Sequence, residues 1–334
     1  MRVFILLIVI LSATLLGGTM STPAAAQPVS SNLLAQKMQA ACSFLNSLYN
    51  PPLGLARTTA NSNIYYIASD NLLVEKALSP CNSTTRPAIN QSISSCCDNG
   101  NDRMHEALLG VQIPLPITLP LTYTIAESAV GRQFRGVSPA AAGGNYTVLW
   151  EFHNATGTFP DCTYSDVTVY TALELRREGN TTGAQHDMEC LNLMFDGRGM
   201  ADEAYKGGPF IQYGLYQTYK LALYIYALQK ISGSHFYAYE ENLLRSQGPD
   251  GGFHTGYDQI GTYAGTQENA ETTAIAMIVL SSLSAANPFL FPIFSIPSWI
   301  VYFFAAWALI GVGVVVSVLL YERRKQKQSF QTKH

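Results

Sequence analysis

The chain has 334 residues, of which 48% are hydrophobic and 13% charged, with 20 Lys and Arg against 23 Asp and Glu. The formal net charge is −3, and the acidic excess grows when the two ends of the chain are set aside. An acidic body disfavours binding to a polyanion, so we expect no nucleic-acid partner.

The first 26 residues have the features of a secretory signal peptide. A short charged start, Met1-Arg2-Val3, is followed by an apolar run and then by Ala24 and Ala26. These alanines supply the small-x-small pattern that a signal peptidase accepts. We therefore expect cleavage after Ala26.

Apolar residues recur with a period near 3.6 in several segments, which predicts helices. The segments are residues 33–48, 70–78, 102–109, 166–177, 184–195, 213–231, 236–245 and 266–285. Their connections are short and rich in Gly, Asn and Pro, which indicates a mainly α-helical domain of helical hairpins over residues 27–297. Residues 111–160 instead alternate β-branched and aromatic residues with polar ones, which predicts an insertion of short strands or extended loops.

A second long apolar segment, residues 298–320, follows this domain. No charged residue occurs from Trp299 to Leu320, and roughly 20 apolar residues are enough for a helix to cross a bilayer. The basic segment 321–334 comes next, and the positive-inside rule places it in the cytoplasm. The sequence thus predicts a single-pass protein of the cell membrane, with its N-terminal domain outside.

Six cysteines lie in the predicted exterior domain: Cys42, Cys81, Cys96, Cys97, Cys162 and Cys190. An even number in an oxidising compartment predicts three disulfides, with about 15 possible pairings. Adjacent cysteines rarely pair with each other, so we expect Cys96 and Cys97 to have other partners. Paired Cys-x-x-Cys motifs and nearby His ligands are absent, so we predict no metal site and no cofactor.

Five Asn-x-Ser/Thr sequences lie between residues 82 and 180. Their asparagines are Asn82, Asn90, Asn145, Asn154 and Asn180. Clustered in one exterior region, they predict a glycan-coated surface.

Two glycine-rich turns follow predicted helices and share an Asp-Gly step and a later Gly-apolar step. Their second glycines, Gly199 and Gly252, are 53 residues apart, and a weaker copy surrounds Gly54. A spacing near 50 with one helical pair per unit is typical of a helical-hairpin repeat. Glycine provides the left-handed backbone and the close contact that such turns need.

The segment Gln247-x-x-Asp250-Gly251-Gly252-Phe253 resembles the Gln-x-x-Asp-Gly-Gly-(Trp/Phe) turn of α/α-toroid proteins. That group includes terpene cyclases, prenyltransferases and six-hairpin glycosidases. The resemblance implies inner and outer rings of helices over residues 32–285, with a ring that is incomplete or partly hidden in residues 80–160. The Asp-x-Asp-Asp motif of terpene cyclases and the zinc ligands of protein prenyltransferases are missing. Six-hairpin glycosidases and related polysaccharide lyases therefore fit best.

Acidic residues gather where the most apolar predicted helices begin. In a toroid these helix starts open on the central cleft, where two carboxylates can divide into general acid and general base. The candidate catalytic residues are Asp70, Asp166, Asp258, Glu268 and Glu271. The alternative is that they only cap helices and interact favourably with the positive end of the helix dipole.

Candidate substrate-binding residues lie near the glycine turn and on the tyrosine-rich segment before residue 220. They are His254, Tyr257, Tyr213 and Tyr216, whose rings suit stacking on sugars, although such tyrosines also pack in cores. His105 and the His186-Asp187 pair are interpreted as solvated helix faces. We expect a surface protein that binds or processes carbohydrate or another cell-surface polymer, as a glycoside hydrolase or lyase if it is an enzyme. The alternative is a non-catalytic structural or interaction module.

Overall fold

The computed structural model describes residues 29–61, 64–97, 104–207, 214–234, 237–263 and 265–286. Contacts divide the chain into two units, Met1–Ser284 and Ala285–His334, and the described elements belong to the first except for the end of the last helix. The expected signal peptide, residues 1–26, the expected span, residues 298–320, and the basic tail, residues 321–334, lie outside the described residues.

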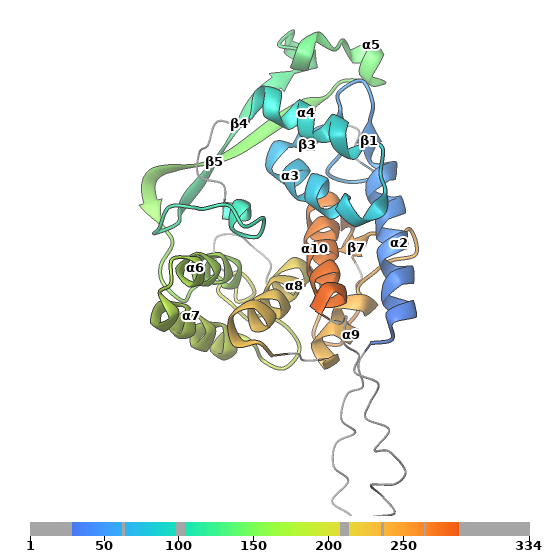
Figure 1. Ribbon diagram of the computed structural model, residues 1–334. Helices are drawn as coiled ribbons and strands as arrows, with labels where there is room; N and C mark the ends of the chain where they lie inside the picture. The colour runs from blue at the N-terminus through green and yellow to red at the C-terminus, as the bar shows by residue number, and fades with distance from the viewer. Residues whose placement is uncertain are drawn as a thin grey trace, which may run out of the picture. The chain divides into compact units, whose positions relative to one another are not determined.

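Helices and small sheets alternate along the chain, and about half of the described residues are helical (Figure 1). The α-helices are α2 (Ser31–Ser47), α3 (Ala68–Ala77), α4 (Arg86–Cys96), α5 (Pro139–Ala142), α6 (Ser165–Arg177), α7 (Thr181–Met194), α8 (Thr218–Ala227), α9 (Tyr237–Arg245) and α10 (Ala270–Ala286). The predicted class, a mainly α-helical toroid, is therefore wrong, because several sheets join these helices.

The length of the strands explains why the sequence pattern did not predict most of these sheets. They are β1 (Tyr49–Asn50), β2 (Leu55–Ala56), β3 (Tyr65–Ile67), β4 (Thr118–Glu127), β5 (Thr147–Thr158), β6 (Tyr216–Gln217), β7 (Phe253–His254), β8 (Gly256–Tyr257) and β9 (Glu268–Asn269). The pairs β1–β2, β6–β8 and β7–β9 are separate two-stranded sheets. Strands of two residues are too short to show an alternating apolar pattern.

The largest sheet among the described residues has the order β3-β5-β4. Strands β4 and β5 lie antiparallel in the insertion, where Tyr123 pairs with Trp150, so the strands predicted for residues 111–160 are confirmed. Strand β3 joins from outside the insertion and runs parallel to β5, with Tyr65 opposite Thr147. This pairing ties the insertion to the start of α3, which follows β3 directly.

Helices α8 and α10 lie between α2 on one side and the α6–α7 pair on the other (Figure 1). Every side chain from Ala274 to Leu280 of α10 is buried, and so are most side chains of α8. Both segments are apolar nearly all round, as a helix surrounded by protein must be. Helix α6 packs against α7 and α8, and α3 packs against α4, a helix that the sequence pattern did not predict.

A search of the described residues for a helix long and apolar enough to cross a membrane finds none. The described residues therefore do not support the single-pass membrane localisation expected from the sequence, and the expected span, residues 298–320, lies outside them. Helix α10 is buried by the helices and strands around it.

All six cysteines are paired, as the even count predicted. The disulfides join Cys42 to Cys81, Cys96 to Cys97 and Cys162 to Cys190. The expectation that the adjacent cysteines have other partners was wrong. They lie at the end of α4, where the backbone leaves the helix at Cys97 with φ −135° and ψ −9°.

The two glycine turns share a backbone conformation. The glycine after the aspartate, Gly197 in one turn and Gly251 in the other, has φ of +94° and +93° respectively. Each turn is closed by an antiparallel bridge, between Phe195 and Met200 and between Gln247 and Phe253. The repeat seen in the sequence is therefore a repeat of turn geometry, and each copy connects one helix to the next.

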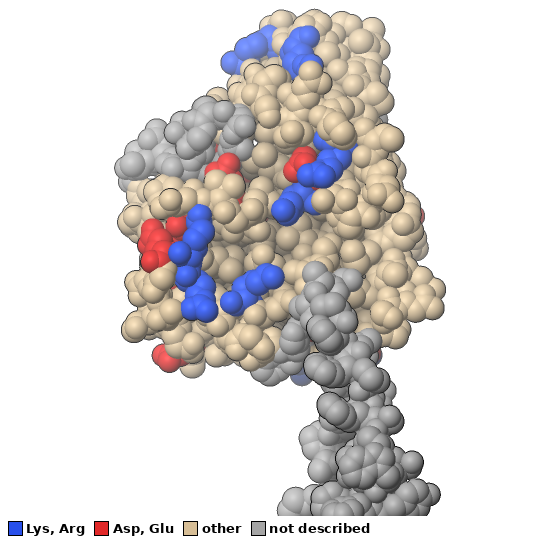
Figure 2. Space-filling view, in the orientation of Figure 1, with Lys and Arg blue, Asp and Glu red and all other residues tan. Residues whose placement is uncertain are grey.

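Charged side chains are scattered over the face drawn in Figure 2, most of which consists of uncharged residues. Acidic and basic side chains are intermixed there, in keeping with a charged fraction of only 13%. That face offers no continuous basic surface of the kind that follows a nucleic-acid backbone.

Candidate functional site

Four buried helices place polar side chains in their first turns. These side chains are Asp70 on α3, Asp166 on α6, Lys220 on α8 and Glu271 on α10. An extended residue precedes each of α3, α6 and α8, and none of these three residues makes a side-chain capping bond. The partial positive charge of a helix N-terminus favours a carboxylate in the first turn.

Electrostatic interactions connect Asp70, Asp166 and Glu271, because Glu271 raises the pKa of Asp70 and shares two tyrosine neighbours with Asp166. The charges of Asp166 and Glu271 both raise the pKa of the buried Tyr170 and Tyr219 hydroxyls, after burial itself as the largest cause. Together with Glu151 of β5, these three residues form what we call the carboxylate cluster. Three of the five predicted catalytic residues therefore belong to one group.

Asp70 is the most buried member of the cluster. Asp70 is only 4% exposed, and its Oδ2 atom has no hydrogen-bond partner among the described residues. Burial, then the negative charges of Glu271 and Glu151, raise the pKa of Asp70 well above its ordinary value. Such a carboxyl holds its proton at a pH where an exposed aspartate has lost it.

Glu151 links the sheet to the helix starts. It lies opposite Thr122 in the β4–β5 pairing, and the Thr122 hydroxyl donates to Glu151 Oε1 over 3.2 Å. The Ser69 hydroxyl donates to the other carboxylate oxygen over 3.3 Å. Glu151 thereby reaches from β5 to the residue beside Asp70, and the sheet becomes one wall of the cluster.

His105 lies against Glu271, with 3.6 Å between His105 Nε2 and Glu271 Oε1. The imidazole is buried and meets the Tyr170 ring edge-on, with 5.7 Å between ring centroids. Burial alone lowers the pKa of His105, but the interaction with Glu271 and the charges of Glu151 and Asp166 outweigh it and raise that pKa. The 28% exposure of the Glu271 side chain makes it the open member of this pair.

Asp166 is held by groups on α8. The Tyr219 hydroxyl donates to Asp166 Oδ2 over 2.7 Å, and Lys220 Nζ lies 3.5 Å from Oδ1. Lys220 also donates to Asp202 Oδ2 over 2.7 Å, and that oxygen accepts the backbone N–H of Ser165. Burial pushes the pKa of Asp202 up, but Lys220 and Ser165 more than offset this and lower it. These bonds fasten the start of α6 to α8.

The other two predicted catalytic residues, Asp258 and Glu268, bond to turns. Asp258 is partly buried and closes its own turn by accepting from the backbone N–H groups of Ile260 and Thr262. Glu268 accepts from the N–H of Gly252 over 3.1 Å and faces His254 at 4.0 Å. Both carboxylates stabilise turns, and a catalytic role for them stays a prediction.

The predicted substrate-binding residues divide in the same way. Tyr216 is buried, stacks on Tyr205 at 4.5 Å and donates to Asp196, so it is a packing residue. Tyr257 donates to the Arg198 carbonyl but also lines a pocket of about 540 Å³. His254 stacks on Tyr263, which lines the same pocket, and Tyr213 lies outside the described residues.

The surroundings of the predicted glycosylation sequences are partly defined. Asn82, Asn90, Asn145 and Asn180 are exposed, as an acceptor must be, whereas the side chain of Asn154 is outside the described residues. Asn180 is also the N-cap of α7, because its side chain accepts from the Gly183 N–H. Occupancy of these sites remains a prediction.

The sequence pattern missed several residues of the site. Glu151 lies within β5, and the sequence around it contains no motif that marks an acidic site. Asp202 lies in the loop before α8. His105 was interpreted as a solvated residue because it adjoins Glu106, yet it is 8% exposed. A histidine that follows a polar segment and adjoins a glutamate gives no signal that distinguishes a buried residue from an exposed one.

Comparisons of this chain with models of protein families, with curated proteins and with solved structures find no match. Among the described residues, the groups with the spacing of metal ligands surround His186 and do not include the carboxylate cluster. What the cluster can do must therefore follow from its own chemistry. It combines a buried carboxyl whose pKa is raised by burial and by its negative neighbours with a more exposed carboxyl, which is an arrangement suited to proton transfer.

Proposed function

We propose that the carboxylate cluster is an acid–base site that cleaves glycosidic bonds, with Asp70 as the general acid and Glu271 as the general base. The observation that carries the proposal is the burial of Asp70 beside two negative carboxylates, with one oxygen that no other group engages. Like charges and desolvation separate the pKa values of neighbouring carboxyls, which is how two such groups take opposite roles.

The roles of Asp70 and Glu271 follow from how exposed each carboxyl is and from the side chains beside it. Asp70 keeps its proton because its carboxyl is desolvated, and it can deliver that proton to a leaving oxygen. Glu271 is more open, so it can accept a proton from water, and the cationic form of His105 beside it would hold the carboxylate in place. His105 is thus a positioning residue rather than a catalytic one.

A carbohydrate substrate is favoured by the pocket formed by Tyr257, Tyr263, Arg198 and Arg245. Tyrosine rings and arginine groups together match the apolar faces and the hydroxyls of a sugar. Strand β8, which carries Tyr257, pairs with β6, and β6 runs directly into α8 with Tyr219 and Lys220. One short sheet therefore connects the wall of the pocket to the residues around Asp166.

The test is turnover by the full-length protein on a panel of nitrophenyl glycosides and soluble polysaccharides. We expect release of product, and a loss of kcat of about 100-fold or more in Asp70→Asn and in Glu271→Gln. Glu241→Gln is the matched control, since Glu241 is an exposed carboxylate that pairs with Arg245 on the same helix. Melting curves of all variants separate lost chemistry from lost folding.

Absence of turnover on every substrate would rule out the enzymatic proposal. A glycan array with the same protein then tests whether the domain binds carbohydrate without cleaving it. Binding without turnover would assign the domain to the non-catalytic carbohydrate-binding class, and no binding at all would remove carbohydrate as the ligand.

A further inference from the structure

A second polar group lies in the loop before α6 and on α7, around His186. Its donor atoms come from Asp161, His186 and Asp187, and all of them lie within 4.8 Å of one another. His186 Nε2 is 3.6 Å from Asp161 Oδ2. The side chains of His186 and Asp161 are 58% and 75% exposed, so this group is open to solvent on one side.

Asp187 differs from its two neighbours because it is buried. The residue is 3% exposed, and its Oδ2 atom has no hydrogen-bond partner. An uncompensated carboxylate away from water is costly, and proteins normally pair such a group with a cation or a metal ion. The described surroundings of Asp187 contain an imidazole and a second carboxylate but no lysine or arginine bonded to it.

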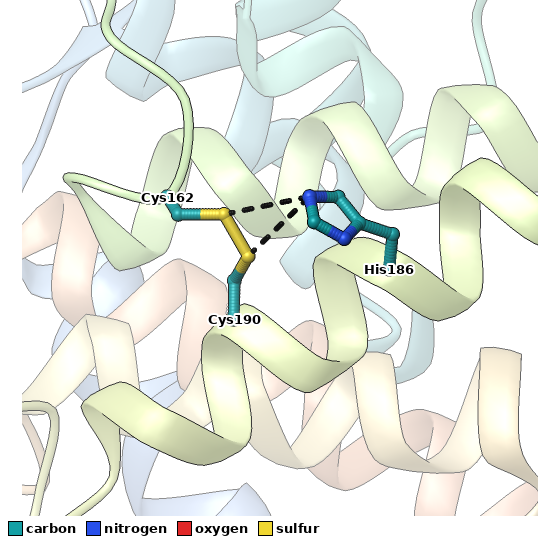
Figure 3. A group of neighbouring side chains, drawn as sticks. All are labelled: Cys162, His186 and Cys190. Carbon is teal, nitrogen blue, oxygen red and sulfur yellow. Dashed lines mark hydrogen bonds between the residues drawn. A yellow bond between two sulfur atoms is a disulfide. The ribbon is translucent and has the colours of Figure 1, made fainter.

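The disulfide beside this group fixes its geometry. Cys162 follows Asp161 directly, and its bond to Cys190 ties this loop to α7 (Figure 3). His186 Nε2 is 3.8 Å from each of the two sulfur atoms, and its ring points toward them. The sulfurs are bonded to each other and are not thiolates, which leaves the imidazole and the carboxylates as the metal-binding groups.

We infer that Asp161, His186 and Asp187 form a binding site for a divalent transition-metal ion, with Zn²⁺ as the preferred ion. Zinc takes ligands from histidine nitrogen and carboxylate oxygen, commonly with water in an open position. Magnesium and calcium prefer sites built only from oxygen, so the imidazole selects against them. The buried, unpartnered Asp187 oxygen is the second observation that distinguishes this group from a chance gathering of surface charges.

The experiment measures Zn²⁺ binding to the full-length, metal-stripped protein with its disulfides intact, by calorimetry and by metal analysis after dialysis. We expect one equivalent of Zn²⁺, no comparable binding of Mg²⁺, and a rise in melting temperature. Asp187→Asn and His186→Gln should each weaken binding at least about tenfold. Glu189→Gln, an exposed carboxylate on the same helix, should bind like the unchanged protein.

Three results would overturn the inference. The first is the absence of stoichiometric Zn²⁺ binding, and the second is binding that Asp187→Asn leaves unaltered. The third is binding that appears only after a dithiol reductant has opened the Cys162–Cys190 bond and that is lost in Cys190→Ser. That outcome would assign the ion to thiolate ligands instead of the carboxylates. Asp187→Asn removes a buried charge and keeps the side-chain shape, so the variant remains foldable for the measurement.

Discussion

Lys220 and Asp202 form a buried ion pair, with 2.7 Å between Nζ and Oδ2 and side-chain exposures of 3% and 1%. Asp202 also accepts the Ser165 N–H and hydroxyl, so the pair joins the loop before α8 to the first turns of both α6 and α8. Asp166 adds a second negative group at 3.5 Å from the same ammonium. Lys220 is thus the cation that balances two carboxylates at the base of the cluster.

Lys220→Met should destabilise the fold strongly, because it leaves Asp202 and Asp166 without their cation. Removing one partner of a buried pair costs about 3–5 kcal/mol. Urea unfolding at neutral pH measures this, with Arg245→Ala as the control. Arg245 pairs with Glu241 on the surface, and such pairs contribute roughly 1 kcal/mol or less. The double variant Lys220→Met/Asp202→Asn should recover part of the loss, and equal costs for Lys220→Met and Arg245→Ala would refute the role given to Lys220.

Asp70→Asn should stabilise the protein at neutral pH and change little in acid. The folded-state pKa of Asp70 is raised by burial and by Glu271 and Glu151, so folding favours its protonated form. At a pH below the unfolded-state pKa the carboxyl is neutral in both states and nothing is lost. As pH rises from there through the folded pKa, the penalty grows, and asparagine does not incur it.

The measurement for Asp70 is the free energy of unfolding of both proteins from about pH 4 to pH 8. We expect their difference to grow in favour of Asp70→Asn with rising pH, reaching about 1–3 kcal/mol. Asp258→Asn is the control with the opposite sign. Hydrogen bonds from Thr262 lower the pKa of Asp258, so its carboxylate adds stability above the unfolded pKa and loses it as pH falls. A flat difference for Asp70→Asn would contradict the assignment of a raised pKa.

The starts of the apolar helices were the part of the site that could be predicted from sequence. Asp70, Asp166 and Glu271 each precede a strongly apolar helical segment, and a local pattern is enough to find that combination. Glu151 could not be found in this way, because it reaches the cluster through the pairing of β5 with β3, whose Tyr65 lies 82 residues from Thr147 in the chain. Local periodicity carries no information on such a pairing.

The same limit explains the error in fold class. Seven of the eight predicted helical segments correspond to α-helices, for example 236–245 to Tyr237–Arg245, because each is long enough to show its period. Helices α4 and α5 were not predicted, and the predicted helix 102–109 is a short 3₁₀ helix, Met104–Ala107, in the described residues. The two-residue strands that connect them carry no period and were read as loops. For a related reason, the sequence does not show that the carboxylates of Asp258 and Glu268 bond to nearby backbone N–H groups.

Gly199→Ala should destabilise the fold by steric conflict. A Cβ atom at Gly199 would lie 2.6 Å from the Tyr216 ring and 2.7 Å from the Tyr257 hydroxyl, both of which are held by their own hydrogen bonds. Overpacking of this kind costs about 1–3 kcal/mol. Gly131→Ala is the control, because Gly131 has φ +85° but open space around it, so only the conformational cost of roughly 1 kcal/mol applies. Thermal unfolding of both variants gives the comparison, and a smaller loss at Gly199 than at Gly131 would show that the tyrosines yield to the extra methyl group.

The disulfides should contribute unequally to stability, because they close loops of very different length. Cys42–Cys81 links positions 39 residues apart, and in the chain-entropy account a loop of that size is worth about 4 kcal/mol. Cys96–Cys97 joins adjacent residues and restricts the unfolded chain very little. We therefore expect Cys42→Ser/Cys81→Ser to lower the free energy of unfolding by about 3–4 kcal/mol and Cys96→Ser/Cys97→Ser by less than about 1 kcal/mol, in denaturant titrations without reductant. Comparable losses from both double variants would show that the bond at the end of α4 stabilises the folded state itself, through contacts that loop entropy does not describe.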